Sequence, residues 1–259
     1  MPYHDFFTQA TGHRPFPYQR RIADTQSPLP PLLHIPTGAG KTPGVILAWL
    51  WRRRFADGES RHAMPRRLVY CLPMRVLVEQ TGHVTVRWLY RLGLLAGQVH
   101  IADDIVLAYE ADAADARPVE GWAQAQGRAG PRIAVHELMG GEETDDWDLY
   151  PEREAILIGT QDMLLSRALN RGYGMSRYRW PMHFGLLNHD CLWVLDEVQL
   201  MGAGLATTAQ LQAFRETFGT LTPVQSLWMS ATLRPDWLAT VDFKDTVRTL
   251  TPLTLGPED

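Results

Sequence analysis

The chain has 259 residues, of which 45% are hydrophobic and 21% are charged, and its formal net charge is −4 at pH 7. This length suits one large domain or two small ones, with a core that needs neither disulfides nor a structural metal. The two cysteines, Cys71 and Cys191, lack any metal-binding spacing, which excludes a disulfide scaffold and a structural zinc site. No apolar run approaches the ~18 residues of a membrane span and no signal-peptide pattern is seen, so we expect a soluble, cytoplasmic protein without a membrane partner.

Short apolar runs alternate with helical patterns along the chain, which predicts βαβ units and a mostly parallel sheet flanked by helices. The strand patterns lie at residues 32–35, 67–72, 132–137, 155–159, 191–195 and 225–229. The helical patterns lie at residues 42–55, 75–92, 161–170 and 205–218. The order of these patterns predicts an α/β fold.

The same patterns divide the chain into three segments. We expect residues 1–25 to form an N-terminal segment, residues 26–245 to form the sheet domain, and residues 246–259 to form a departing linker. Residues 99–130 are rich in Ala, Asp and Gly and have weak periodicity, which indicates an insertion or long loop over the edge of the sheet. The arginines at 52–54 end a predicted helix, where we expect them to face the solvent.

A glycine-rich segment follows the first predicted strand and precedes the first predicted helix. It consists of Pro36, Thr37, Gly38, Ala39, Gly40, Lys41 and Thr42. Glycines let backbone N–H groups curl around phosphates, and a helix N-terminus adds a partial positive charge. In such a loop Lys41 reaches the β- and γ-phosphates of a nucleotide and the hydroxyl of Thr42 binds Mg²⁺. The consensus G-X4-G-K-[S/T] holds except at its first glycine, where Ile35 stands.

Lysine usage supports the same interpretation. Of the 25 cationic residues, only Lys41 and Lys244 are lysines. Lysine offers a compact point charge where arginine offers a planar fork, so a lysine retained in an arginine-rich chain indicates a special requirement. This favours a nucleotide loop over a glycine turn that only caps a helix.

The predicted strand at 191–195 is followed by two adjacent acids, Asp196 and Glu197. A nucleotide loop needs a carboxylate for its metal at the end of a neighbouring strand. Asp196 would hold Mg²⁺ through water, and Glu197 would polarise the attacking water. Alone, such a pair is a common solvated end of a strand, but with Lys41 and Thr42 it predicts an ATP site.

These two motifs, in this form and order, resemble those of superfamily 2 helicases and translocases. The first RecA-like lobe of those proteins carries both motifs. The resemblance implies a RecA-like, mostly parallel sheet of the P-loop NTPase type, with ATP and Mg²⁺ as cofactors. It also implies ATP hydrolysis in which Lys41, Asp196, Glu197 and Gln199 take part.

Two further segments resemble motifs of that family at the nucleotide. Residues 15–19 are similar to the Q motif, which implies that Gln19 reads the adenine edge with Phe16 or Tyr18 as an aromatic neighbour. Ser230, Ala231 and Thr232 are similar to motif III, which implies that Ser230 and Thr232 link hydrolysis to strand movement.

Two other segments resemble the family's contacts to nucleic acid. Residues 72–80 are similar to motif Ia, and residues 159–162 occupy the next equivalent turn between strand and helix. The similarity implies that Arg75, Gln80 and Thr160 contact the backbone of a nucleic-acid strand. A cation at the start of a helix suits a phosphate through both its charge and the helix dipole.

A closer similarity is to the helicase–nuclease of type I CRISPR systems, which unwinds and degrades foreign DNA. It is carried by residues 34–42, by residues 138–141 with Trp147 following and residues 158–164 beyond, and by residues 193–201. Gln199, where many relatives have His, resembles the subtype once called I-U. The resemblance covers residues 12–233 and implies single-stranded DNA and a CRISPR surveillance complex as partners.

That family also has parts that this sequence does not show. A superfamily 2 motor uses a second RecA-like lobe, yet only Arg234 and Arg248 follow Thr232 as arginines. The nuclease domain needs His-Asp ligands, and here the pair at 189–190 more simply begins a strand. We therefore expect the first lobe only, inactive by itself and completed by a second lobe and a nuclease domain.

Two alternative functions stay open. One is a generic RNA or DNA helicase lobe of superfamily 2, although the 99–130 insertion and the Asp-Glu-Val-Gln sequence at 196–199 weigh against an RNA helicase. The other is an interaction domain without turnover. Against it stand intact Lys41, Thr42 and the acidic pair, which a scaffold has no physical need to keep.

Overall fold

The computed structural model describes residues 1–259 except 56–60, 62, 117–131, 141–145 and 173. In the described ranges, seven strands form one sheet in the order β5-β6-β2-β7-β8-β1-β9, and each neighbouring pair is parallel. The strands are β1 (Leu32–His34), β2 (Arg67–Leu72), β5 (Ala134–Leu138), β6 (Ala155–Thr160), β7 (Cys191–Leu195), β8 (Val224–Ser230) and β9 (Leu253–Thr254). The predicted α/β fold with a mostly parallel sheet is confirmed.

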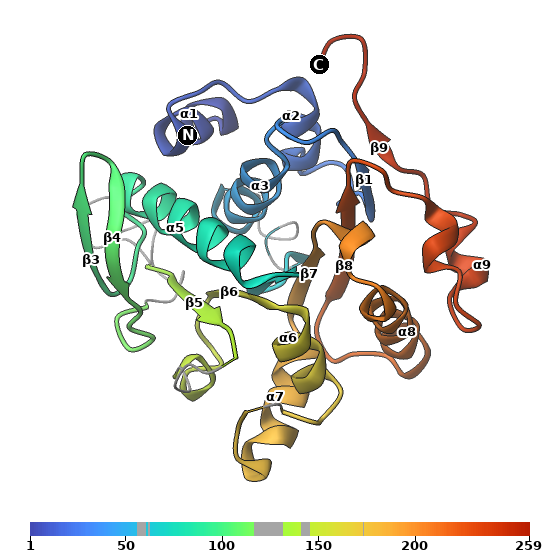
Figure 1. The fold of residues 1–259 in the computed structure, drawn as a ribbon. Coiled ribbons are helices and arrows are strands. Elements are labelled where there is room, and N and C mark those ends of the chain that lie inside the picture. Colours follow the sequence, from blue (N-terminus) through green and yellow to red (C-terminus); the bar gives the residue numbers. More distant parts are fainter. Residues whose placement is uncertain (56–60, 62, 117–131, 141–145, 173) are drawn as a thin grey trace.

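Helices cover both faces of this sheet (Figure 1). One face is covered by α1 (Tyr3–Thr11), α2 (Pro17–Ala23), α3 (Lys41–Phe55) and α5 (Arg75–Arg91), and the other by α6 (Gln161–Ala168), α7 (Trp180–Leu187) and α8 (Ala203–Phe218). The short helix α9 (Lys244–Val247) follows β8. Within the described part of the chain, no helix combines the length and apolar character needed to cross a bilayer.

Alternation along the strands builds a separate core on each face. Successive side chains of a strand point to opposite faces of the sheet. In β2, Leu68, Tyr70 and Leu72 therefore join the core under α3 and α5, whereas Val69 and Cys71 join the core under α6 and α8. Burial on both faces explains why these strands are continuous apolar runs in the sequence.

The segment after residue 246, for which we expect a linker, adds a strand to the edge of the sheet. Leu253 and Thr254 pair with β1. The carboxylate of Asp259 accepts hydrogen bonds from Arg21, at 2.7 Å, and from the backbone N–H of Tyr18, which tie the segment to α2.

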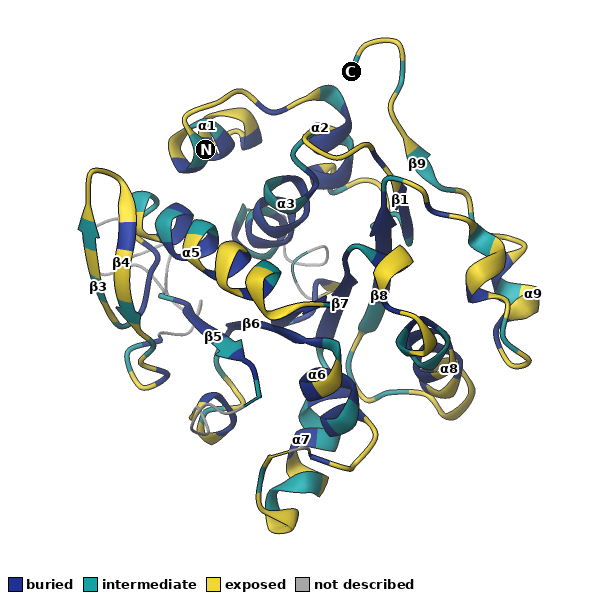
Figure 2. Cartoon of the chain, in the orientation of Figure 1, coloured by how far each residue is buried: buried dark blue, intermediate teal, exposed yellow. Residues whose placement is uncertain are grey.

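Within residues 99–130 the described part contains an antiparallel hairpin, β3 (Gln98–Ala102) and β4 (Ile105–Glu110). Its turn residues Asp103 and Asp104 have φ values of 49° and 64°, as a tight hairpin turn requires. Asp104 pairs with Arg91 of α5 at 2.5 Å, and much of the hairpin is exposed (Figure 2). Residues 117–131 of the predicted insertion lie outside the described residues.

The expectation that the arginines at 52–54 face the solvent was wrong. Arg54 is 1% exposed and Glu154 is 2% exposed, with 2.6 Å between Arg54 Nη2 and Glu154 Oε2. Arg53 Nε lies 2.7 Å from the other oxygen of Glu154, and Arg52 donates to the carbonyl of Ile22 at 2.9 Å. The partners come from distant parts of the sequence, so the composition of the helix end alone did not reveal them.

Candidate nucleotide site

The glycine loop lies between β1 and α3, at the carboxyl ends of the strands. Gly38 and Gly40 have φ values of 80° and 77°, in the left-handed region that residues with a Cβ adopt only with strain. The loop therefore needs glycine at both positions in order to turn from the strand into the helix. Thr37 and Gly38 are exposed, whereas Ala39 and Gly40 are half-buried.

Residues 16–19 support this loop from beneath. Gln19 is 1% exposed; its Nε2 donates to the carbonyl of Gly40 at 2.7 Å, and its Oε1 accepts from the backbone N–H of Phe16 at 2.8 Å. The hydroxyl of Tyr18 donates to the carbonyl of Ala39 at 2.7 Å. In this structure the Gln19 amide therefore holds the loop, and direct reading of adenine by Gln19 stays a prediction.

Lys41 begins α3 and is buried beneath the loop. Its amine donates to the carbonyls of Ile35, at 3.3 Å, and Pro36, at 3.5 Å, and lies 3.8 Å from Glu197 Oε1. These contacts are long, so the charge of the amine is only partly compensated. The amine is thus placed beside the loop with capacity to bind an anion.

Asp196 follows β7 and is joined to Thr42 through Tyr70. The Tyr70 hydroxyl lies 2.8 Å from Asp196 Oδ2, to which it donates, and 3.3 Å from Thr42 Oγ1. Burial raises the pKa of the Asp196 carboxyl to about 6, against the opposing effect of the Tyr70 hydrogen bond. A carboxylate that is costly to ionise here would gain from a nearby cation.

Glu197 starts a polar chain that runs to β8. Glu197 has a φ of 52°, which turns its backbone away from the strand direction. Its Oε2 accepts from Gln199 Nε2 at 2.5 Å, and Gln199 Oε1 accepts from the hydroxyl of Ser230 at 2.6 Å. The Ser230 oxygen in turn accepts from the backbone N–H of Thr232 at 3.0 Å. Glu197 and Gln199, which the sequence predicts for catalysis, are therefore connected to Ser230 and Thr232, which it predicts for coupling.

These groups suit a triphosphate with a divalent cation. The loop offers backbone N–H groups and contains two glycines with positive φ, and Lys41 offers a cation. Thr42 Oγ1 and Asp196 supply oxygen atoms, the ligand type that Mg²⁺ prefers. The residues predicted for phosphate, metal and water thus meet at one edge of the sheet.

The residues predicted to contact nucleic acid lie at neighbouring strand ends. Leu72, which ends β2, is paired with Thr160, which ends β6. Arg75 is exposed and begins α5, where its Nη1 donates to the carbonyl of Gly140 at 2.8 Å. Gln80 is exposed on the same helix, whereas Thr160 is buried. Their contact with nucleic acid remains a prediction.

Sequence reasoning missed Tyr70, the residue that connects Thr42 with Asp196. It lies in the apolar run of β2, two residues before the strand ends, and its side chain is fully buried. A tyrosine in a strand predicted to be buried on both faces is a usable signal, because its hydroxyl needs a partner. The partners themselves come from α3 and β7, which only the fold brings together.

No known protein-family model and no curated protein matches this sequence. Solved structures of helicases do share its fold. The helicase MrfA bound to DNA and AMPPNP matches over 100% of this chain and 30% of its own, at 14% identity and a TM-score of 0.59. The Mycobacterium smegmatis helicase Lhr, bound to single-stranded DNA and AMP-PNP, matches over 98% of this chain and 27% of its own, at 16% identity and a TM-score of 0.54.

A third similar structure is S. cerevisiae Dbp5 L327V bound to RNA and ADP BeF3. It matches over 99% of this chain and 50% of its own, at 15% identity and a TM-score of 0.51. The chain thus spans between 27% and 50% of these three proteins. At these identities the likeness concerns the fold, and the chain has the RecA-like α/β fold of helicase lobes.

Proposed function

We propose that this chain is the ATP-binding lobe of a nucleic-acid helicase or translocase. The observation that carries the proposal is the meeting of Thr42, Tyr70 and Asp196 beside the buried amine of Lys41. The similar structures named above hold a nucleotide together with DNA or RNA, which supports the same function for this fold.

In this proposal each residue of the site has a separate task. The loop amides and Lys41 bind the phosphates, while Thr42 and Asp196 hold Mg²⁺. When bound, Mg²⁺ would neutralise phosphate charge and polarise the terminal phosphoryl group. Glu197 orients a water molecule and accepts its proton, and Gln199 transmits the state of Glu197 to Ser230 on β8.

Calorimetry with ATP and Mg²⁺ tests the proposal. Replacement of Lys41 by Ala removes a charged phosphate contact, which should cost about 1.5–3 kcal/mol of binding free energy. Lys244→Ala is the matched control, because Lys244 is the other lysine and lies exposed on α9. Equal heats from wild type and Lys41→Ala would refute the assignment of Lys41.

The nucleic-acid contact is proposed for Arg75, Gln80 and Thr160, at the ends of β2 and β6. A single lobe offers few phosphate contacts, so binding to a labelled strand should be weak, independent of sequence and lost at moderate salt. Tight binding that survives high salt would place the strand on another surface.

A more specific proposal is the helicase–nuclease of type I CRISPR systems, with single-stranded DNA as the translocated strand. It is supported by the three resembling segments, of which residue 141 lies outside the described residues. Completion by a second lobe and a nuclease domain, and a cytoplasmic location, belong to this proposal. A gene neighbourhood without CRISPR repeats would contradict it, while the ATP-binding proposal would stand.

An interaction domain without turnover is the competing function. It predicts no heat with ATP and no response to nucleotide. The calorimetric measurement therefore separates the two functions directly.

A further inference from the structure

The segment between α6 and β7 differs from the rest of the chain in charge. Residues 163–189 contain four arginines and no aspartate or glutamate, although the whole chain has a net charge of −4. The four are Arg167, Arg171, Arg177 and Arg179. A local excess of positive charge on an acidic protein indicates a surface for an anionic partner.

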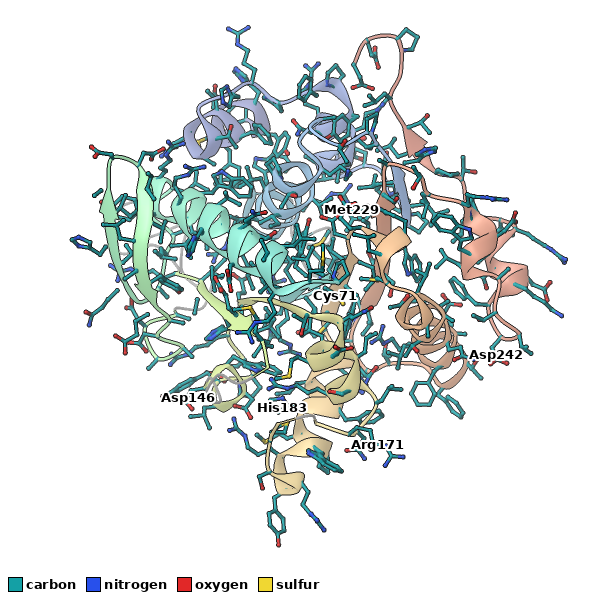
Figure 3. The ribbon with its side chains drawn as sticks, viewed as in Figure 1. Cys71, Asp146, Arg171, His183, Met229 and Asp242 are labelled. Atoms are coloured by element: carbon teal, nitrogen blue, oxygen red, sulfur yellow. The ribbon has the colours of Figure 1, made fainter. Side chains whose placement is uncertain are left out.

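Two of these arginines are paired or buried within the protein, and the other two are exposed. Arg179 pairs with the buried carboxylate of Asp148, with 3.1 Å between Nε and Oδ2, and Arg167 is buried. Arg171 and Arg177 are exposed, and neither has a carboxylate partner among the residues that the structure describes. Figure 3 shows Arg171 beside α7, away from Cys71 at the centre of the sheet.

An exposed aromatic residue is the sequence neighbour of one of these exposed arginines. Tyr178 is 90% exposed and directly follows Arg177 in the sequence. A large aromatic side chain without a packing partner is an informative exception on a protein surface. Exposed rings interleaved with cations suit single-stranded nucleic acid, because bases stack on the rings while the cations bind phosphates.

The segment is held in place by internal contacts. The indole of Trp180 covers Gly172, where a Cβ would lie 2.1 Å from Trp180 Cδ1, and its Nε1 donates to the carbonyl of Met175 at 3.3 Å. Together with the Arg179–Asp148 pair, these contacts fix an open cavity of about 640 Å³ lined by Arg171, Met175 and Trp180. The backbone around the cavity is therefore held in place by contacts within the protein.

A groove lies between the proposed nucleic-acid contact at Thr160 and this segment: its lining begins at Gln161, next to Thr160 in the sequence, and reaches Leu169, two residues before Arg171. It has a volume of about 670 Å³ and runs between α6 and α8, from Gln161 to Leu169. The backbone N–H of Arg171 bonds to the carbonyl of Ser166, on the same helix, at 2.8 Å. The eight residues of α6 span about 12 Å. Three or four nucleotides cover that distance at the spacing of about 3.4 Å that a strand has in duplex DNA.

We propose that Arg171, Arg177 and Tyr178 form a second contact for single-stranded nucleic acid, which extends the strand path from Thr160 along α6. Arg171 and Arg177 bind phosphates of the strand, and Tyr178 stacks on one of its bases. The inference rests on the proposed nucleic-acid binding of this chain. It assigns part of the affinity to a surface away from the strand ends of the sheet.

The first test measures fluorescence anisotropy of a labelled single-stranded DNA at several salt concentrations. The variant Arg171→Ala/Arg177→Ala removes two exposed cations, and Lys244→Ala/Arg248→Ala removes two exposed cations on α9 as the matched control. Loss of two phosphate contacts should reduce the magnitude of the salt slope by about 1.4. The control should keep the slope of the wild type.

The second test concerns the ring. Tyr178→Leu keeps an apolar side chain but removes stacking, and Tyr178→Phe keeps stacking but removes the hydroxyl. The exposure of Tyr178 makes both variants compatible with folding. Affinity should fall about fivefold or more for Tyr178→Leu, and remain near the wild-type value for Tyr178→Phe. A single-stranded RNA of the same sequence, in parallel, shows which sugar the surface accepts.

The outcomes separate this inference from the function on which it rests. If the wild type binds the strand and the arginine and tyrosine variants bind equally well, the second contact is refuted while the proposed nucleic-acid binding stands. If the wild type binds neither DNA nor RNA, with or without ATP, both are refuted. Displacement of the strand by polyglutamate as effectively as by unlabelled DNA would also overturn the inference, since it would show an acidic-protein surface.

Discussion

The two edges of the sheet treat buried charge in opposite ways. At the amino-terminal edge, Glu154 is bound by Arg54 and Arg53 at 2.6 and 2.7 Å. At the carboxyl-terminal edge, Lys41 and Glu197 lie 3.8 Å apart, and burial raises the pKa of Asp196 to about 6. The amino-terminal edge pairs Glu154 with arginines of the protein at short distances, and we call it the complete edge. At the carboxyl-terminal edge the opposite charges lie further apart, and we call it the incomplete edge.

This difference has a physical consequence for function. A buried charge is costly unless it is paired and hydrogen-bonded. At an edge with complete pairs the charges are compensated by each other, so they contribute to the stability of the fold rather than to ligand binding. An edge with incomplete pairs gains when a phosphate and a cation bind, since each ligand charge compensates a protein charge.

Removing the carboxylate at the complete edge should produce the largest effect. In Glu154→Gln, Arg54 would be buried without a counter-charge, which should lower the free energy of unfolding by about 3–5 kcal/mol. Glu152→Gln is the control, because Glu152 is exposed and pairs with Arg153 at 3.3 Å. Urea unfolding of both variants measures the difference, and equal midpoints would show that the buried pair contributes nothing.

Replacing an acid by its amide should raise the free energy of unfolding at the incomplete edge, whereas the same replacement lowers it at the complete edge. The native state holds the proton of Asp196 more tightly than the unfolded chain, whose ordinary value is 3.8. Unfolding free energy is therefore lost as pH rises from about 4 to about 6, and Asp196→Asn should recover on the order of 1–3 kcal/mol at pH 8.

The amide oxygen that Asp196→Asn introduces can still accept a hydrogen bond from the Tyr70 hydroxyl. The hydroxyl can alternatively donate to Thr42. Thermal unfolding at pH 8 and pH 4, without nucleotide, measures the effect. The gain should be present at pH 8 and absent at pH 4. A variant less stable than the wild type at pH 8 would contradict the contrast between the two edges.

The buried pair His183–Asp148 tests an intermediate case, in which one ring nitrogen is paired. His183 Nε2 lies 2.9 Å from Asp148 Oδ2. Burial lowers the pKa of His183, only partly opposed by the hydrogen bond to Asp148, so the native ring resists a proton that the unfolded chain accepts. Unfolding free energy should therefore fall as pH drops below 6.5, the ordinary value.

Asp148 contributes at lower pH. Burial would raise its pKa, but hydrogen bonds from His183 and Arg179 outweigh burial and hold it below its ordinary value, so its stabilisation is lost only as pH falls below about 3.8. His183→Gln should remove the dependence just below pH 6.5 and leave the dependence at lower pH. Denaturant titrations at pH 7, 5 and 3 separate the two, and an unchanged profile between pH 7 and 5 in His183→Gln would exclude the histidine as the source of the dependence just below pH 6.5.

The sequence predicted the elements of the sheet well because buried parallel strands are distinctive. The apolar runs at 67–72 and 191–195 coincide with β2 and β7. The edge strand β9 was missed because a two-residue strand has no periodicity. The hairpin β3–β4 was missed although β4 contains the apolar run 105–109, because that run lies in a stretch with weak periodicity that predicts an insertion or long loop. The parallel sheet therefore followed from the apolar pattern of its core and the RecA-like fold from the resemblance of the motifs, whereas the edge strand and the hairpin followed from neither.

The residues of the candidate site also divide into those that the sequence predicted and those that it missed. Glycines, Lys41 and the acidic pair were found because local spacing encodes them. Tyr70 was missed because its partners are contributed by two other elements. Gln19 was placed at the nucleotide from its motif, yet its amide contacts depend on the position of Gly40, which only the folded loop defines.

The smallest effect that we predict concerns Ser230, which connects the incomplete edge to β8. Its hydroxyl donates to Gln199 at 2.6 Å, and Ser226 on the same strand donates to Gln212 at 2.7 Å. Both serines are buried, so each Ser→Ala change should cost about 1 kcal/mol of stability. Only Ser230→Ala releases Gln199 and thereby Glu197, so it alone should show an interaction with Lys41→Ala in a double-mutant cycle of ATP binding.

That interaction energy should be about 0.5 kcal/mol or more, since residues that share a hydrogen-bonded network are not independent. Ser226→Ala combined with Lys41→Ala should be additive, because Ser226 bonds toward α8, away from the loop. Calorimetry on the five variants (three single and two double) and the wild type gives both cycles under one set of conditions. If the Ser226 and Ser230 cycles give the same interaction energy, the chain from Glu197 to β8 carries no information about the nucleotide.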